Sequence, residues 1–205
     1  FDLTLTEEYQ QIPLVNHYLE QYKKFYNSPK ILEHYRKFDS TFSFKQPGDF
    51  FKILHVKRDE ILAHDKTSRI QNGITWLGQL LCDKQEGFPL EDLTLEKLYE
   101  LGKQIKMTTG CLECFTKLKE NWKEKGIDVH IFIVSVGLKT LIRGAIDGYM
   151  ETNNIKQNPI DGIYSAEISE TIIEIDNKKK HMFEVISVIE DYSKTEIAYE
   201  IAKGG

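Results

Sequence analysis

The feature that most limits how this chain can fold is the segment 129–144, VHIFIVSVGLKTLIRG. It opens with an almost continuous apolar run, residues 129–134, which is typical of a strand buried on both faces in a parallel sheet. Ser135 ends this run, Gly137 follows, and apolar residues at helical spacing begin with Leu138. The pattern predicts a buried strand, a turn and a helix, with a hydroxyl at the carboxyl end of the strand.

This junction is a candidate site for an anion. Open α/β sheets bind ligands beyond the carboxyl ends of their strands, and the amides at a helix N-terminus favour a negative charge. The Ser135 hydroxyl and the backbone amides of Val136 and Gly137 are therefore candidate donors. A serine at such a turn is also often only an N-cap, so this stretch alone leaves both interpretations open.

The composition argues against two kinds of partner. The formal net charge is −5, whereas a general nucleic-acid binder needs a basic surface to engage phosphates. The sequence has no apolar run long enough to cross a bilayer and no segment with the layout of a signal peptide. We therefore expect no nucleic-acid partner, no membrane partner and a cytoplasmic location, while the oligomeric state is not predicted.

The cysteine and histidine patterns favour structural over chemical roles. Cys82, Cys111 and Cys114 are an odd set without a disulfide framework, which suits a reducing compartment. Cys111 and Cys114 form a CxxC at the start of an amphipathic helix pattern, with no second pair to complete a zinc site. We interpret them as small residues on a helix face rather than a redox or metal pair. His130, inside the expected strand, is interpreted as a core histidine.

Helical patterns dominate the middle of the chain. Helices are expected from Pro13, from Pro29, around Phe50, over 70–81, after Thr94 and over 111–126. Two β patterns follow at 160–175 and 182–189, where a hairpin turn at 176–177 makes the second a returning strand, and a last helix is expected at 195–203. The order predicts an α/β protein in which a helical block is inserted into a sheet-forming core.

Three stretches carry a resemblance to a known family. They are FDLTLT at 1–6, IFIVSVG at 131–137 and YSKTEIAYEIAKGG at 192–205. In this order and strand context they resemble the haloacid dehalogenase-like phosphatases, in particular the phosphoserine-phosphatase-like branch. That family has a strand ending in Asp-x-Asp-x-Thr, a strand ending in Ser or Thr, a Lys at a helix start, and an acidic pair after another strand.

The resemblance implies both a fold and a reaction. The fold is α/β, with a Rossmann-like core and parallel sheet from residues 1–12 and 107–205, and an all-helical cap inserted at 13–106. The reaction is Mg²⁺-dependent hydrolysis of a small phosphomonoester through an aspartyl-phosphate intermediate, with the cap closing over the site. For the cap aromatics, helical spacing favours core packing over lining the site; these residues are Tyr18, Tyr22, Phe50 and Trp76.

The resemblance also assigns residues to roles. Asp2 matches the first motif, Ser135 the second and Lys194 the third, and these three are the implied catalytic residues. The serine hydroxyl and the lysine ammonium would stabilise the phosphoryl group, and a carboxyl group would protonate the leaving alcohol. The implied substrate-binding residues are Thr4, Val136 and Gly137.

Two alignments of the first motif remain open. In the first, Asp2 is the general acid/base and a Mg²⁺ ligand, and the nucleophilic aspartate lies before Phe1; Leu-Thr-Leu-Thr commonly follows the second aspartate in this family, which favours this alignment. In the second, Asp2 is itself the nucleophile. The acidic fourth motif is expected beyond Gly205, so we expect the sequence to be an internal portion of a longer chain.

Two functional alternatives are also retained. One is a non-catalytic binding or regulatory module of the same fold that lacks the nucleophile. The other is a CxxC thiol-redox protein, for which Cys111 would be essential. The sequence names neither the phosphomonoester nor the acceptor of the phosphoryl group, so hydrolysis and transfer to another acceptor are both open.

Overall fold

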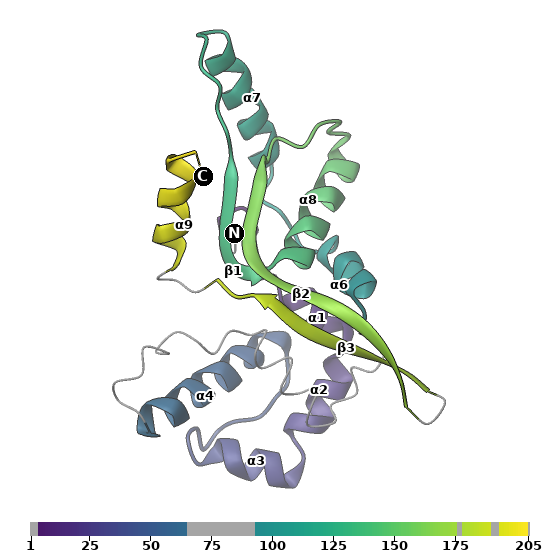
Figure 1. Cartoon of the computed structure of the whole chain (residues 1–205). Coiled ribbons are helices and arrows are strands. Elements are labelled where there is room, and N and C mark those ends of the chain that lie inside the picture. Colours follow the sequence, from purple (N-terminus) through teal and green to yellow (C-terminus); the bar gives the residue numbers. More distant parts are fainter. Residues whose placement is uncertain (1–3, 65–92, 176–177, 190–192, 205) are drawn as a thin grey trace. The chain divides into compact units, whose positions relative to one another are not determined.

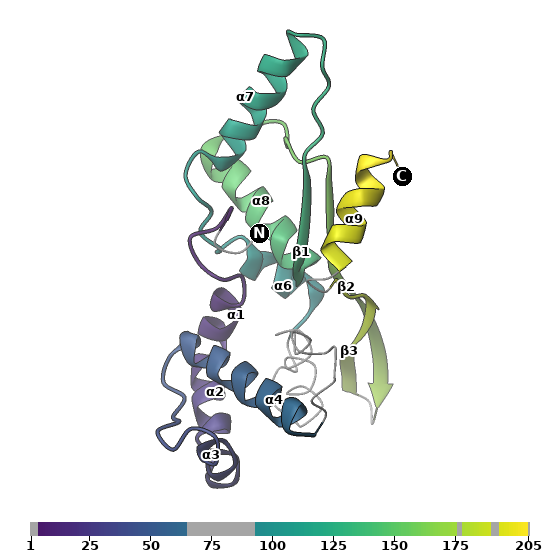
Figure 2. The same ribbon diagram turned by 90° about the vertical axis from the view of Figure 1, so that its left-hand side faces the viewer.

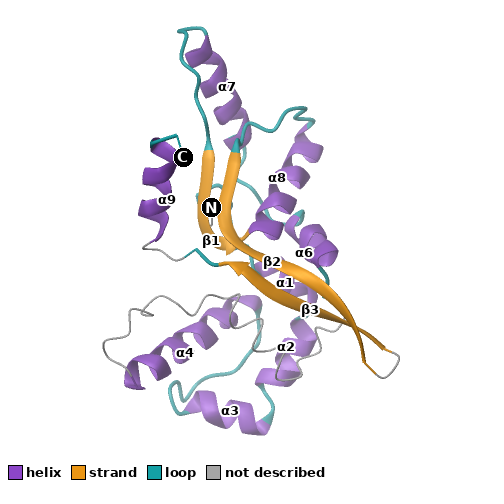
Figure 3. Cartoon of the chain, viewed as in Figure 1, coloured by secondary structure: helices purple, strands orange, loops and turns teal. Residues whose placement is uncertain are grey.

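The structure is a computed structural model of a mixed α/β protein (Figures 1 and 3). It describes residues 4–64, 93–175, 178–189 and 193–204. The chain divides into two compact units, one formed by residues 1–10 and 94–205 and the other by residues 11–93. Across the described ranges, no helix combines the length and apolar character needed to cross a membrane.

The larger unit contains a mixed sheet. Its described elements are α6 (Leu95–Gly102), α7 (Cys111–Lys123), β1 (Phe132–Leu138), α8 (Lys139–Asn153), β2 (Gly162–Ile175), β3 (Lys178–Ser187) and α9 (Ser193–Ala202). The strand order is β1-β2-β3, with β1 parallel to β2 and β2 antiparallel to β3. The parallel sheet implied by the resemblance is therefore wrong for β3, whereas the hairpin expected from the residue pattern is confirmed. Only two residues separate β2 from β3, whereas a parallel return needs a crossover of a dozen or more.

Strand β1 differs from its predicted form in two ways. It begins at Phe132 and continues through Ser135 to Leu138, so Ser135 lies within the strand rather than at its end. Its residues alternate between half-buried and buried up to Gly137, so one side is more deeply buried than the other. The predicted burial on both faces is wrong because a short apolar run does not by itself reveal how many of its faces are covered.

Helix α6 packs on α8 at a contact that only glycine permits. A Cβ on Gly144 would lie 2.2 Å from the carbonyl oxygen of Tyr99, and a Cβ on Gly102 would lie 2.6 Å from that of Leu141. The missing side chains let the two backbones touch. Near this contact the Tyr99 hydroxyl donates to Asp147 Oδ2 at 2.8 Å, which adds a polar link between the helices.

The carboxylate of Glu170 links the antiparallel β2–β3 ribbon to α6 by a hydrogen bond. Glu170 Oε2 accepts the backbone N–H of Leu95 at 3.0 Å, at the first residue of α6. The other oxygen of Glu170 pairs with His181 Nδ1 across the ribbon. A negative group at this position complements the positive end of the helix dipole. Thr94 caps the same helix as predicted, because its Oγ1 accepts the N–H of Lys97.

The smaller unit has an aromatic core. Its described elements are α1 (Ile12–His17), α2 (Leu19–Tyr26), α3 (Pro29–Arg36), the 3-10 helix η1 (Pro47–Asp49) and α4 (Phe50–His64). Tyr22 packs on Phe44 and Phe50 with ring centroids 5.7 Å apart in each case. Core packing of Tyr18, Tyr22 and Phe50 is confirmed, since all three are buried. Trp76 and the helix predicted over 70–81 lie outside the described residues.

The predicted domain boundary and the boundary of the compact units differ. The cap was predicted over 13–106, whereas the smaller unit covers 11–93. Residues 94–106 cluster with the larger unit because α6 packs on α8. Assignment of the two units as catalytic core and cap stays a prediction.

The glycine contact between α6 and α8 makes a testable prediction. Gly144→Ala should lower the free energy of unfolding by roughly 1–3 kcal/mol, because the new methyl group must push two helix backbones apart. Gly48→Ala is the control, since a Cβ there has no neighbour within 4 Å. Urea unfolding measures both, and equal midpoints for the two variants would contradict the proposed contact.

Candidate functional site

Ser135 lies within β1, three residues before Leu138, the N-cap of α8, and is 3% exposed. We call the segment from Ser135 to the start of α8 the β1–α8 junction. Its Oγ accepts the backbone N–H of Gly137 at 3.0 Å. The N-cap of α8 is Leu138, which has no side chain able to cap, so the N-cap interpretation of Ser135 is wrong. Val136 points to the opposite, half-buried side of the strand. The junction thus contains a buried hydroxyl and the amides that precede a 15-residue helix.

Gln10 is a residue of this junction that no sequence pattern identifies. It is fully buried, and its Oε1 accepts the backbone N–H of Leu138 at 2.9 Å. A Cβ at Gly137 would lie 1.8 Å from Gln10 Nε2, so the glycine makes room for the carboxamide. No spacing pattern could reveal this contact, because Gln10 and Leu138 are 128 positions apart.

The hydrogen bonds at the junction set conditions on any ligand. The amides of Gly137 and Leu138 already have acceptors in the chain, namely Ser135 and Gln10. An anion that uses the Gly137 amide must therefore displace the serine oxygen. The Ser135 hydroxyl still has its own proton, because accepting one hydrogen bond leaves the O–H able to donate. Chemically, the junction offers a buried O–H donor beside the start of a helix.

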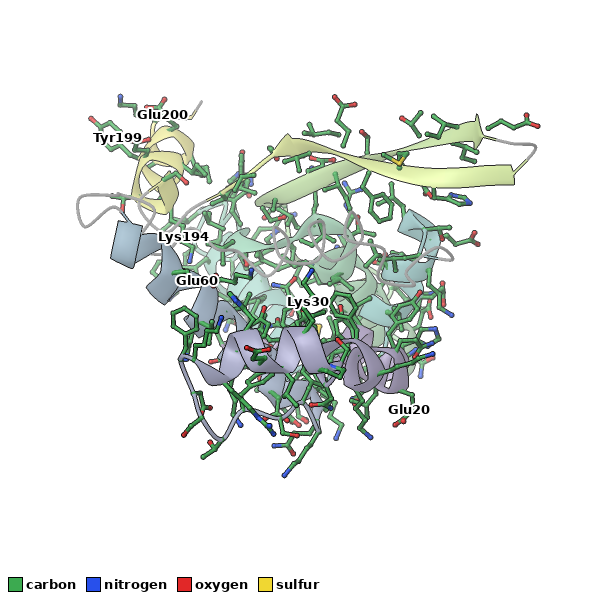
Figure 4. All side chains as sticks on the ribbon, turned by 90° about the horizontal axis from the view of Figure 1, so that it is seen from below. Glu20, Lys30, Glu60, Lys194, Tyr199 and Glu200 are labelled. Carbon is green, nitrogen blue, oxygen red and sulfur yellow. The ribbon has the colours of Figure 1, made fainter. Side chains whose placement is uncertain are left out.

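The other predicted site residues lie on separate segments. Lys194 is the second residue of α9 and is half-buried, and α9 runs beside β1 in both views (Figures 1 and 2). Tyr199 and Glu200 point outward further along the same helix (Figure 4). Thr4 is exposed on a turn. Asp2 lies outside the described residues. The structure therefore brings the Ser135 strand and the Lys194 helix together, while the first motif is only partly described.

The described residues do not by themselves form the implied magnesium site. The resemblance places a metal ligand on Asp2, outside these residues. Among the residues that the structure places, no three His, Cys, Asp or Glu side chains are grouped so that they could hold a metal ion.

The two cysteines of the CxxC differ in exposure, since Cys111 is half-buried and Cys114 is exposed. Cys111 and Cys114 lie in the first turn of α7, after Gly110 in the left-handed conformation. Burial raises the pKa of the Cys111 thiol above its ordinary value. A reactive redox cysteine needs the opposite shift, because the thiolate is the nucleophile. This environment favours the interpretation of small residues on a helix face.

A cavity of about 300 Å³ lies at the amino-terminal ends of β1 and β2. At its wall, Asp161 Oδ2 accepts from Lys119 Nζ and from the Ile131 N–H, both at 2.6 Å. Because Asp161 neutralises Lys119, this cavity is a weaker candidate than the β1–α8 junction for binding an anion. His130 also lines it, with 65% of its side chain exposed, so the core-histidine interpretation is wrong. The reason is that His130 precedes the first residue of β1.

Comparisons of the chain with models of protein families, with curated proteins and with solved structures found no match. The fold and the candidate site define a mixed α/β protein. It contains a parallel β1–α8–β2 unit and the buried Ser135 hydroxyl near the point where β1 meets α8.

Asp161 makes a prediction about pH. Burial alone would raise its pKa, but the hydrogen bonds from Lys119 and the Ile131 amide outweigh burial, so the pKa lies below its ordinary value. Such a group stabilises the fold above its unfolded pKa of about 4, and this stability is lost as the pH falls through the folded pKa. Asp161→Asn should therefore be less stable than wild type at pH 7, with the difference shrinking below about pH 4.

Thermal unfolding between pH 7 and pH 3 measures this difference. Glu120→Gln is the control, because Glu120 is an exposed carboxylate lining the same cavity. A deficit in Asp161→Asn that stays constant over the whole range would show that the ion pair is not its source.

The contact between Gly137 and Gln10 makes a prediction about coupling. Gly137→Ala should lower the free energy of unfolding by roughly 1–3 kcal/mol, because the Gln10 carboxamide must move and the buried Leu138 N–H loses its acceptor. In a Gln10→Ala background, Gly137→Ala should lower the free energy of unfolding by a smaller amount, and the difference should exceed about 0.5 kcal/mol. A double-mutant cycle by urea unfolding measures this coupling, and additive effects would refute the contact.

Proposed function

We propose that this protein is a Mg²⁺-dependent phosphohydrolase of the haloacid dehalogenase-like type, acting on a small phosphomonoester through an aspartyl-phosphate intermediate. The observation that carries the proposal is the β1–α8 junction. There the buried Ser135 hydroxyl of β1 accepts the backbone N–H of Gly137, shortly before α8 begins. Helix α8 connects β1 to the parallel strand β2. This is the position at which open α/β sheets bind anions.

The position of Lys194 gives the second support. It lies in the first turn of α9, and α9 contacts the strand that contains Ser135. A hydroxyl on a strand followed later by a lysine at a helix start is also the order of the second and third family motifs. In this proposal the larger unit is the Rossmann-like core and the smaller unit is the helical cap, which selects the substrate.

The proposed roles follow from charge and hydrogen bonding. A phosphomonoester is an anion, and its attack by a carboxylate brings like charges together. The Lys194 ammonium would reduce this repulsion, and the Ser135 O–H would donate to a phosphoryl oxygen. The carboxylate expected before Phe1 would bond to phosphorus as the P–O bond to the alcohol breaks, and Asp2 would supply the proton to that alcohol. Attack by water would then release phosphate and restore the carboxylate.

The test is hydrolysis of p-nitrophenyl phosphate by the full-length protein, with and without Mg²⁺. Ser135→Ala and Lys194→Ala should each lower kcat/KM by roughly 10²–10³-fold, the usual effect of removing one group that stabilises developing charge. Lys203→Ala is the matched control, because Lys203 is an exposed lysine at the other end of α9. Circular dichroism checks that the variants fold. Full activity in both site variants would refute the assignment.

One observation favours a second candidate, a non-catalytic binding module of the same fold. The amides of Gly137 and Leu138 are already bonded to side chains of the chain itself. A module of this kind would bind inorganic phosphate or a phosphorylated ligand but would not hydrolyse p-nitrophenyl phosphate at any Mg²⁺ concentration. Turnover that depends on Lys194 would exclude it.

A further inference from the structure

Ser165, in β2, is a buried polar residue whose side chain has no hydrogen bond. It is 4% exposed, and its Oγ has no partner within the described part of the chain. Its backbone carbonyl accepts from the Ser187 hydroxyl at 3.4 Å. Buried hydroxyls are nearly always paired, so an unpaired one needs an explanation other than packing.

Ser165 and Ser135 lie on neighbouring parallel strands, each directly after the last regularly paired residue. The two strands pair regularly as far as Val134 and Tyr164; the register then shifts, and the next pair is Leu138 with Ala166. Successive side chains of a strand point to opposite faces. Both hydroxyls therefore lie on the face opposite to Val134 and Tyr164, and both are buried there.

This level of the sheet is where a ligand site is expected. Strand β2 pairs with β1 up to Ala166, and from Glu167 onward it pairs with β3. Figure 1 shows that β2 bends away from β1 at the same place. Ser165 is therefore at the carboxyl end of the parallel part of the sheet, next to the β1–α8 junction.

We propose that Ser165 is a second ligand-binding hydroxyl, which donates its O–H to an oxygen of the same phosphoryl-type anion that Ser135 binds. A tetrahedral oxyanion carries several acceptor oxygens, so hydroxyls from two adjacent strands can bind different oxygens of one ligand. This inference rests on the proposed function and adds a residue that the family resemblance did not assign.

The two serines should differ in their effect on stability, which gives an independent readout. Ser165→Ala removes a buried hydroxyl that has no partner, so the unfolding midpoint should stay the same or rise. Ser135→Ala instead leaves the buried Gly137 N–H without its acceptor, so the midpoint should fall. A residue that weakens ligand binding when removed but does not weaken the fold is acting on the ligand.

The experiment is calorimetric titration of the full-length protein with inorganic phosphate in the presence of Mg²⁺, together with thermal unfolding. Ser165→Ala should raise the Kd for phosphate by roughly tenfold or more, the effect of losing one hydrogen bond to a charged group. Ser169→Ala is the matched control, because Ser169 is a half-buried serine of β2 beyond the bend. Its Kd should equal that of wild type.

The outcomes separate this inference from the proposed function. If Ser135→Ala weakens phosphate binding and Ser165→Ala does not, the role of Ser165 is refuted and the proposed function stands. If Ser165→Ala weakens binding but also lowers the unfolding midpoint, its role is structural and the inference is again refuted. If the wild-type protein binds no phosphate, both the proposed function and the inference fail.

Discussion

The larger unit depends on how buried polar groups are satisfied where β1 meets α8. The first amides of a helix have no partner within it, and Leu138 cannot cap the helix with its side chain. Ser135 accepts the Gly137 N–H from within the strand, and Gln10 accepts the Leu138 N–H from the distant N-terminal segment. Because the site is buried, losing either acceptor would leave an unpaired donor. The second of these bonds therefore ties residue 10 to the centre of the βαβ unit.

The same unit is held together by close backbone packing. Gly144 on α8 and Gly102 on α6 lack the Cβ atoms that would collide with the facing backbone. Close packing of this kind fixes one relative position of the two helices, because the backbone has little freedom to yield. It also explains why residues 94–106 belong with the sheet rather than with the helical block that precedes them.

The polar groups of the described residues differ in how fully they are satisfied, and this difference locates the candidate site. Lys119 and Asp161 neutralise each other at the amino ends of the strands. At the other end, Ser135 keeps a proton to donate and Ser165 has no side-chain partner. Polar groups that the fold leaves unsatisfied are more often found at functional sites than in the rest of a core. The carboxyl end of β1 is thus the better place to look for an anion.

The sequence by itself determined most of the helices, because their signals are local. Pro29 and Thr94 mark helix starts that the structure confirms, and Gly126, with φ 74°, follows the end of α7. It also predicted a helix soon after Ser135, but it placed the serine at the end of the strand, whereas Ser135 lies within β1. Only the tertiary structure decided that Gln10 reaches Leu138 and that Ser135 and Ser165 each directly follow the last regular pair of two neighbouring parallel strands. These contacts are between residues far apart in the chain. The sequence does not predict them, because hydrophobic periodicity indicates that a segment is buried but not which segment packs against it.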